Sequence, residues 1–256
     1  MDIRNGFLIV ASQIKDYVDS ANFLANSIKD YYPEAHITLF TTPSLLQYVD
    51  KEAFDNVIHE DVPSHVRTKL YALSKTPYTN LTCYVDADME CMHEDVRDIW
   101  DEMPEDCDIL ITKIRPYNGK IAKWKNGEMI YHGGFFMYRT NPHTIEFMER
   151  WWLDYYKQRS EPWPYGDEHP IDLRPWDQFT FWKLMNIDKM QANVQVFNDD
   201  ARWNFVNGYY PKEAKGPIVF WHHIPNITHI LVHTFHIRIN ITSKYRDWET
   251  RVFSGA

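Results

Sequence analysis

Residues 81–90 read LTCYVDADME, an apolar segment that ends in two carboxylates. The first five residues favour a β-strand, and Pro77 and Asn80 place a turn before them. Because an unpaired carboxylate is costly to bury, we expect Asp86 and Asp88 at the carboxyl end of a buried strand, where open α/β sheets bind their ligands. Carboxylate oxygens suit a hard divalent cation, so this stretch predicts a metal site. A solvated loop with two acids is the alternative.

The composition limits the classes of protein that remain. A chain of 256 residues with 44% hydrophobic and 16% aromatic residues is long enough for one large core, so we expect one domain. A net charge of −9 argues against strong non-specific binding to nucleic acid. The three cysteines lack the spacing of metal or disulfide frameworks. No signal-peptide pattern and no apolar run of about 18 residues is present, so we expect a cytoplasmic protein without a transmembrane segment.

Hydrophobic periodicity and turn residues predict an α/β sheet on both sides of the acids. The first strand, helix and second strand form a β–α–β unit, which favours parallel pairing, and Asp19 or Ser20 is the expected cap of that helix. Upstream of the acids we expect strands at 7–11, 36–40 and 56–59 and helices at 20–32, 44–48 and 64–74. Downstream we expect strands at 108–112, 135–139, 194–197 and 217–221. We expect helices at 94–103 and 177–185, and a third helix that begins at Asn141-Pro142.

Several features between these elements carry candidate chemistry. Gly133 and Gly134 precede a strand and indicate a close approach of the backbone to another group. The basic, turn-rich segment 113–132 is a candidate for phosphate or acceptor binding, and a plain surface hairpin is the alternative. The segment 158–176 is rich in proline and aromatic residues and long enough to be functional. The spacing of the late histidines 229, 233 and 236 imitates a metal site, although a packed or solvated helix face explains it equally.

Taken in order, these features resemble the GT-A class of nucleotide-sugar glycosyltransferases with a metal-binding Asp-x-Asp motif. The resemblance covers about residues 5–225 and implies a single Rossmann-like domain with a mostly parallel sheet flanked by helices. It implies a catalytic domain at 1–225 and a helical appendage at 226–256. The stretches that carry it are Ser12, Arg67 and Lys69 before Thr76-Pro77-Tyr78, residues 83–88, residues 133–139, Trp176-Asp177-Gln178, Trp203-Asn204 and a late strand ending in His222.

The resemblance implies metal-dependent transfer of a sugar from a nucleoside diphosphate sugar, UDP-linked in many such enzymes, to a hydroxyl acceptor. Mn²⁺ or Mg²⁺ would be held by Asp86, Asp88 and His222, with His223 as the alternative to His222. Asp177 and Asp88 would be the catalytic residues. The residues expected to contact the donor are Ser12, Arg67, Lys69, Asp86, Gly133, Gly134 and Gln178.

One departure from the family pattern concerns the phosphates. Family members often place a glycine and a lysine after the late histidine, whereas residues 223–226 read HIPN here. The donor needs cationic partners, so we expect Arg67 and Lys69 to contact the phosphates, with a solvated helix face as the alternative. The late histidine together with Asp177-Gln178 favours a retaining enzyme over an inverting one. The acceptor is a glycan, a small hydroxylated molecule or a hydroxylated nucleic-acid base.

Two other functions stay open from the sequence. Haloacid-dehalogenase-type phosphatases also place Asp-x-Asp after an apolar strand and would use Asp86 as a nucleophile. Glu90 stands where their pattern wants threonine or valine, and a β–α–β unit precedes the acids here. A non-catalytic sugar-binding module would explain the ten tryptophans but not the paired acids.

Overall fold

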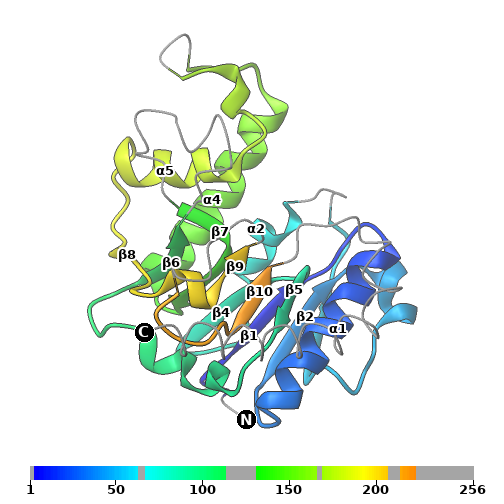
Figure 1. Cartoon of the computed structure of the whole chain (residues 1–256). Helices are drawn as coiled ribbons and strands as arrows, with labels where there is room; N and C mark the ends of the chain where they lie inside the picture. Colours follow the sequence, from blue (N-terminus) through cyan, green and yellow to red (C-terminus); the bar gives the residue numbers. More distant parts are fainter. Residues whose placement is uncertain (1–2, 63–66, 114–130, 166–168, 207–213, 223–256) are drawn as a thin grey trace. The chain divides into compact units, whose positions relative to one another are not determined.

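The stretch with the two acids forms β4 (Leu81–Asp86), the central strand of a seven-stranded sheet with the order β3-β2-β1-β4-β7-β6-β8 (Figure 1). The structure is a computed structural model that describes residues 3–62, 67–113, 131–165, 169–206 and 214–222. Residues 1–223 form one compact unit. The predicted appendage at 226–256, with its three histidines, and the basic segment 114–130 lie outside the described residues.

Most neighbouring strands in this sheet are parallel, which confirms the predicted sheet. Parallel pairing joins β3 (Asn56–His59), β2 (Ile37–Thr41), β1 (Asn5–Val10) and β4 on one side, and β6 (Ile109–Lys113) with β8 (Val194–Val196) on the other. Only β7 (Tyr131–Arg139), among the described strands of this sheet, runs antiparallel to its neighbours, β4 and β6. The carboxyl ends of β1 and β4 therefore meet at one edge, where Val10 pairs with Asp86.

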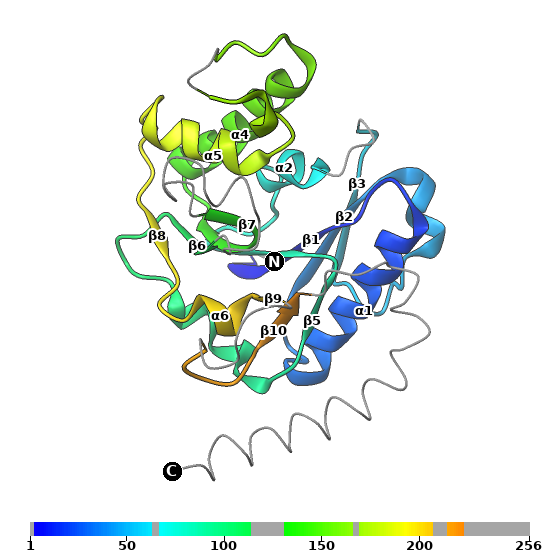
Figure 2. The same cartoon turned by 45° about the horizontal axis from the view of Figure 1, so that its top comes forward.

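Alternate residues of the central strands face two different helical layers, as the strand period requires. Cys83 and Val85 of β4 pack in a cluster with α1 (Lys15–Tyr31), whereas Tyr84 belongs to the cluster on the opposite face. That second cluster includes residues of α2 (Thr68–Leu73), α4 (Pro142–Ser160) and α5 (Asp177–Asn186). The views in Figures 1 and 2 show α1 beside β1 and β2, and α4 and α5 next to each other.

The start of α1 was predicted too late. The helix begins at Lys15, after the extended residue Ile14, and not near Ser20. The predicted cap Asp19 lies inside the helix and pairs with Lys15 one turn earlier, while Ser20 is buried. Asp16 stands in the first turn, where an acid interacts favourably with the helix dipole.

The other helix predictions are confirmed with shifted boundaries. Asn141 caps α4 as expected, since its side-chain oxygen accepts a hydrogen bond of 2.9 Å from the Thr144 N–H. Within α4, Met148, Trp151 and Tyr155 are buried, and Trp151 lies deeper than its neighbour Trp152. The helices predicted at 44–48 and 94–103 are 3₁₀ helices, η1 (Pro43–Tyr48) and η2 (Glu94–Glu102). A third 3₁₀ helix, η5 (Ile171–Leu173), lies within the segment 158–176.

A second, small sheet was not predicted. It consists of β5 (Met89–Cys91), β10 (Phe220–His222) and β9 (Phe205–Val206), and α6 (Asp200–Trp203) leads into β9. The predicted strand at 217–221 is therefore confirmed only for its last residues. Antiparallel pairing sets His222 opposite Met89, which directly follows Asp88. This pairing brings the late histidine to the end of β4.

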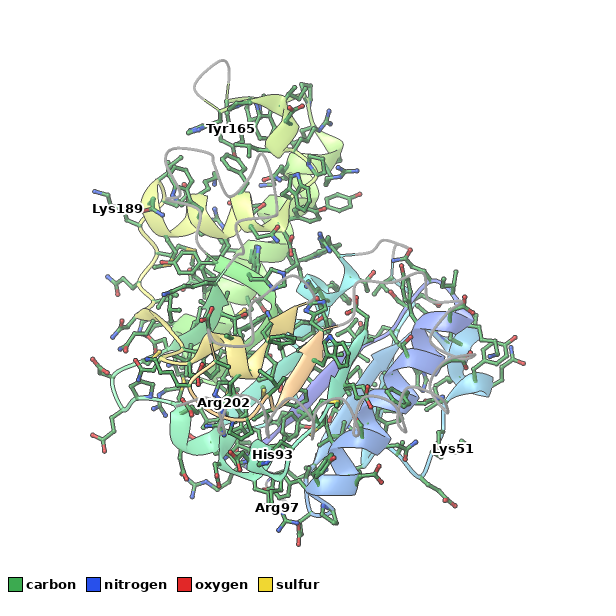
Figure 3. The ribbon with its side chains drawn as sticks, viewed as in Figure 1. Lys51, His93, Arg97, Tyr165, Lys189 and Arg202 are labelled. Carbon is green, nitrogen blue, oxygen red and sulfur yellow. The ribbon has the colours of Figure 1, made fainter. Side chains whose placement is uncertain are left out.

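The segment between α4 and α5 packs on its own aromatic cluster. Leu173, Phe179 and Trp182 are buried there, and Trp163 and Tyr165 pack against them. Tyr165 is labelled in Figure 3. The three cysteines are buried and form no disulfide. Within the described part of the chain, no helix has the length and apolar character needed to cross a membrane.

Candidate functional site

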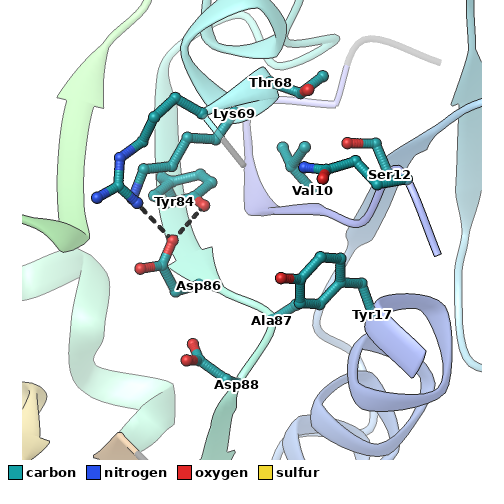
Figure 4. Close-up of a pocket in the computed structure, with 11 residues that line it drawn as sticks. Val10, Ser12, Tyr17, Thr68, Lys69, Tyr84, Asp86, Ala87 and Asp88 are labelled. Atoms are coloured by element: carbon teal, nitrogen blue, oxygen red, sulfur yellow. Dashed lines mark hydrogen bonds and ion pairs between the residues drawn. The ribbon is translucent and has the colours of Figure 1, made fainter. Parts of the chain in front are cut away.

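Asp86, the last residue of β4, is held by two partners through one oxygen. Its Oδ1 atom accepts hydrogen bonds from Lys69 Nζ at 2.9 Å and from the Tyr84 hydroxyl at 2.5 Å (Figure 4). Lys69 is itself buried and also donates to the Gly133 carbonyl at 2.6 Å. Burial by itself would raise the pKa of Asp86, but the charge of Lys69, and then that of His222, outweigh it and keep the pKa below its ordinary value. The carboxylate therefore stays ionised at the strand end.

Asp86, Asp88 and His222 meet at one point. Each offers one ligand atom, and these atoms all lie within 4.8 Å of one another. The His222 Nε2 atom is 3.3 Å from Asp88 Oδ1. Burial lowers the pKa of His222, but the carboxylates of Asp88 and Asp86 more than offset this and raise it. His223, the alternative ligand, lies outside the described residues.

These three side chains fit a divalent cation. Two carboxylates and one imidazole suit Mn²⁺, and carboxylates suit Mg²⁺ as well. Because Asp86 Oδ1 is occupied by Lys69 and Tyr84, its other oxygen, Oδ2, is the one that would bind a cation. The predicted ligand set is thus assembled by two sheets, with both acids at the end of β4 and His222 in β10.

Gly134 lies where the backbone approaches the site most closely. A Cβ atom added there would lie 2.7 Å from His132 Cε1, 2.8 Å from His222 Cε1 and 3.0 Å from Asp86 Oδ2. The register shift between Ile111 and Thr112 in the β6–β7 pairing lets this part of β7 bulge toward the acids. The predicted close approach is therefore confirmed for Gly134. A Cβ on Gly133 would meet Asp177 Oδ2 and Trp151 at the ordinary contact distance of 3.5 Å.

Arg67 and Asp177 form a second acid–base pair beside the first. Arg67 Nε lies 3.1 Å from Asp177 Oδ1, and only 1% of the Asp177 side chain is exposed. The charge of Asp177 raises the pKa of Arg67. Neither carboxylate oxygen of Asp177 accepts a hydrogen bond from the residues that the structure describes, and the same holds for Gln178 Oε1. The first two residues of α5 thus carry three buried acceptor atoms.

This pairing predicts that Arg67 stabilises the fold through Asp177. Arg67→Met leaves a buried carboxylate without its counter-ion, so we expect the free energy of unfolding to fall by about 3–5 kcal/mol. Replacing both partners, Arg67→Met with Asp177→Asn, should recover most of that loss, since no unpaired charge remains. Denaturant unfolding measures both. The matched control is the exposed Arg150, whose partner Asp154 keeps a second cation, Lys183, at 2.9 Å, so Arg150→Met should cost about 0.5 kcal/mol or less. Equal losses at the two arginines would contradict the buried pair.

A cavity of about 300 Å³ opens beside the acids. The predicted donor contacts Ser12, Arg67 and Lys69 line it together with both acids (Figure 4). Its wall also includes Tyr17, in the first turn of α1, and Gln13, whose φ of 85° is rare for a residue with a side chain. Two further predicted residues adjoin the residues that line it, since Asp177 pairs with Arg67 and the Gly133 carbonyl accepts a hydrogen bond from Lys69. Gln178 follows Asp177 in sequence.

Sequence reasoning missed Tyr84 and Tyr17 as parts of the site. For Tyr84 a signal existed, because residues two apart on a strand share a face and Tyr84 lies two before Asp86. For Tyr17 the misplaced start of α1 concealed its position in the first turn. Asn204 entered the prediction only as part of the Trp203-Asn204 resemblance, without a role. Its contact with His222 crosses from α6 to β10, and no local pattern indicates it.

Comparisons with known proteins support a fold assignment. No protein-family model and no curated sequence matches the chain. Among solved structures, the glycosyltransferase GlyE of Streptococcus pneumoniae superimposes with a TM-score of 0.58 at 11% identity, covering 87% of this chain and 56% of GlyE. The galactosyltransferase LgtC, solved with donor and acceptor sugar analogues, gives 0.53 at 14% identity, with 86% and 87% covered.

The chain has the GT-A fold of glycosyltransferases. A glycosyltransferase involved in glycosylating the major capsid of PBCV-1 is also similar, with a TM-score of 0.50, 12% identity, and 88% of this chain and 96% of that chain covered. At these identities the similarity establishes the GT-A fold and leaves the reaction to be argued from the site. The resemblance in the sequence is confirmed at that level.

Proposed function

We propose that this chain is a metal-dependent glycosyltransferase that moves a sugar from a nucleoside diphosphate sugar, UDP-linked, to a hydroxyl acceptor. The convergence of Asp86, Asp88 and His222 beside a cavity of about 300 Å³ in a GT-A fold carries this proposal. Mn²⁺ or Mg²⁺ bound there supplies Lewis-acid stabilisation of the diphosphate leaving group. Lys69 and Tyr84 orient Asp86 toward the cation, and His222 closes the ligand set from β10.

The charges around the cavity make donor binding depend on the cation. Lys69 is matched by Asp86 and Arg67 by Asp177, so Asp88 leaves the region negative when His222 is neutral. This negative charge would disfavour a diphosphate, and a divalent cation held by Asp86, Asp88 and His222 would offset it. Arg67 and Lys69 line the cavity and remain the proposed phosphate contacts. Each can hydrogen-bond to a phosphate oxygen of the sugar nucleotide while it stays paired with its carboxylate, Asp177 or Asp86.

The start of α5 has the properties of a sugar-binding site. The buried oxygens of Asp177 and Gln178 lack hydrogen bonds from the described residues, and sugar hydroxyls would donate such bonds. Asp177 is almost fully buried and paired with Arg67, which suits a group that positions the donor sugar better than a base for an acceptor hydroxyl. We therefore propose retention of the anomeric configuration, and NMR of the first product distinguishes it from inversion.

A donor panel tests the proposed function. The protein is incubated with Mn²⁺ or Mg²⁺ and a series of UDP-, GDP- and CMP-linked sugars, and release of the nucleotide is measured with and without chelator. We expect metal-dependent release from a nucleoside diphosphate sugar. Hydrolysis of aryl phosphates that is lost in Asp86→Asn would instead support the phosphatase. Sugar binding without release of nucleotide from any donor would support the non-catalytic module.

A further inference from the structure

Asn204 lies behind His222 and is completely buried. Its Oδ1 atom is 2.9 Å from His222 Nδ1. Its amide nitrogen donates to Thr112 Oγ1 at 2.9 Å and lies 3.0 Å from His132 Nδ1. One side-chain amide thus connects the histidine in β10 to β6 and β7.

The surroundings determine which way this amide points. The single proton of the Thr112 hydroxyl is directed at two backbone carbonyls, that of Phe135 at 3.0 Å and that of His132 at 3.3 Å, so the hydroxyl oxygen is an acceptor toward Asn204. His132 Nδ1 accepts from the Gly134 N–H at 3.3 Å, so it is an acceptor as well. A flipped amide would turn its carbonyl oxygen toward two lone pairs. The nitrogen of Asn204 must therefore face Thr112 and His132, and the oxygen must face His222.

This orientation determines the tautomer of the neutral His222 ring. An amide oxygen accepts hydrogen bonds and cannot donate them, so Nδ1 of His222 donates its proton to Asn204 at 2.9 Å. Asp88 Oδ1 competes for the proton at Nε2, but it is farther away, at 3.3 Å, and its side chain is 41% exposed to water. The lone pair of the imidazole is then on Nε2, the atom that lies 3.3 Å from Asp88 Oδ1. The same reasoning assigns the opposite tautomer, with the proton on Nε2, to the neutral ring of His132.

Asn204 is itself held from several sides. Its backbone N–H donates to the Asp200 carbonyl at 3.0 Å, which closes α6. The preceding residue, Trp203, is fully buried and stacks on Phe135 with ring planes 17° apart. Arg202, labelled in Figure 3, ties the same helix to η2 through an ion pair with Asp95 at 2.5 Å. A side chain on so constrained a segment can orient its partner.

We propose that Asn204 is a positioning residue of the metal site, which fixes the ring and tautomer of His222 so that Nε2 presents its lone pair beside Asp88. This inference rests on the proposed metal site and deepens it. Partners behind a metal-ligating histidine commonly determine its tautomer, and their loss lowers metal affinity about 10- to 100-fold. Thr112 and His132 act one step further back, by determining the orientation of Asn204.

The first test reads the tautomers directly and needs neither metal nor donor. Nitrogen-15 NMR of histidine-labelled protein is recorded at alkaline pH, where both rings are neutral, with His132→Gln and His222→Gln used to assign the signals. We expect the Nδ1–H tautomer for His222 and the Nε2–H tautomer for His132. An Nε2–H tautomer at His222 in the wild-type protein would overturn the proposal, whether or not any variant folds.

The second test measures affinity for Mn²⁺ by the electron paramagnetic resonance of the free ion. Asn204→Leu, similar in size but without hydrogen bonds, should bind Mn²⁺ about 10- to 100-fold more weakly than wild type. Asn204→Asp keeps the acceptor for His222 and should preserve its tautomer, while the proton on His132 should move to Nδ1. Thr112→Val, which leaves the His132 contact intact, should lose less affinity than Asn204→Leu.

The outcomes separate this inference from the proposed function. Wild-type affinity for Mn²⁺ in a folded Asn204→Leu protein overturns the positioning role, even if glycosyl transfer is demonstrated. The expected tautomers and the weakened Mn²⁺ binding support the role, even if the donor panel releases no nucleotide.

Discussion

Asp88→Ala is expected to abolish metal-dependent nucleotide binding and sugar transfer while the protein stays folded. Asp88 lies between β4 and β5, and 41% of its side chain is exposed. The buried His222 ring loses its 3.3 Å contact with Asp88 but keeps its hydrogen bond to Asn204, so we expect the fold to be retained. It supplies one of the two carboxylates of the proposed ligand set, and the remaining Asp86 shares its charge with Lys69. Calorimetric titration with UDP in the presence and absence of Mn²⁺ measures the effect.

The control for this prediction is Glu90→Gln. It removes one negative charge from the adjacent strand β5, outside the cluster of Asp86, Asp88 and His222. Nucleotide binding by this variant should keep its dependence on Mn²⁺. Unchanged Mn²⁺-dependent binding in Asp88→Ala, or full activity of the wild type in chelator, would show that the acids do not hold a functional cation.

Gly134→Ala is expected to weaken Mn²⁺ binding and destabilise the fold, although it adds only a single methyl group. The new carbon would be closer than 3.0 Å to both His132 and His222 and 3.0 Å from Asp86 Oδ2. His222 is buried and cannot rotate away freely, so the ligand set must distort. We expect a loss of Mn²⁺ affinity of about 10-fold or more, together with a destabilisation of about 1–3 kcal/mol from overpacking.

Gly133→Ala is the matched control, because it adds the same group to the adjacent residue. Its Cβ would meet Asp177 and Trp151 at 3.5 Å, which is ordinary van der Waals contact. The Mn²⁺ affinity of this variant should stay close to wild type. If the two alanine variants bind Mn²⁺ alike, Gly134 does not lie against the cation ligands as the structure places it.

The central strand and its acids were predictable because their signals are local. Charged side chains are costly to bury, and this rule alone places Asp86 and Asp88 at the end of the apolar strand. Asn141-Pro142 marks a helix start without information from the rest of the chain. The meeting of His222 with the acids was predicted through the resemblance. In the structure it results from strands of three residues, β5 and β10, which are too short to show a period of two.

The ion pairs of the site could not be predicted from the sequence. Arg67 and Lys69 were predicted to contact the donor phosphates, with a solvated helix face as the alternative. Neither interpretation included the ion pairs that Arg67 forms with Asp177 and Lys69 with Asp86. These contacts join elements that are distant in the chain, and the bulge of β7 that brings Gly133 to Lys69 depends on its pairing with β6. Burial of Lys69 is favourable only because Asp86 is there, so neither residue predicts it alone.

The most direct measurement is anomalous diffraction at the manganese edge from crystals grown with Mn²⁺ and UDP. We expect one strong peak within about 2.5 Å of an oxygen of Asp86, an oxygen of Asp88 and Nε2 of His222, with the diphosphate of the nucleotide completing the shell. A peak that lacks these ligands, or a nucleotide bound away from the carboxyl end of β4, would contradict the proposed metal-dependent glycosyltransferase site.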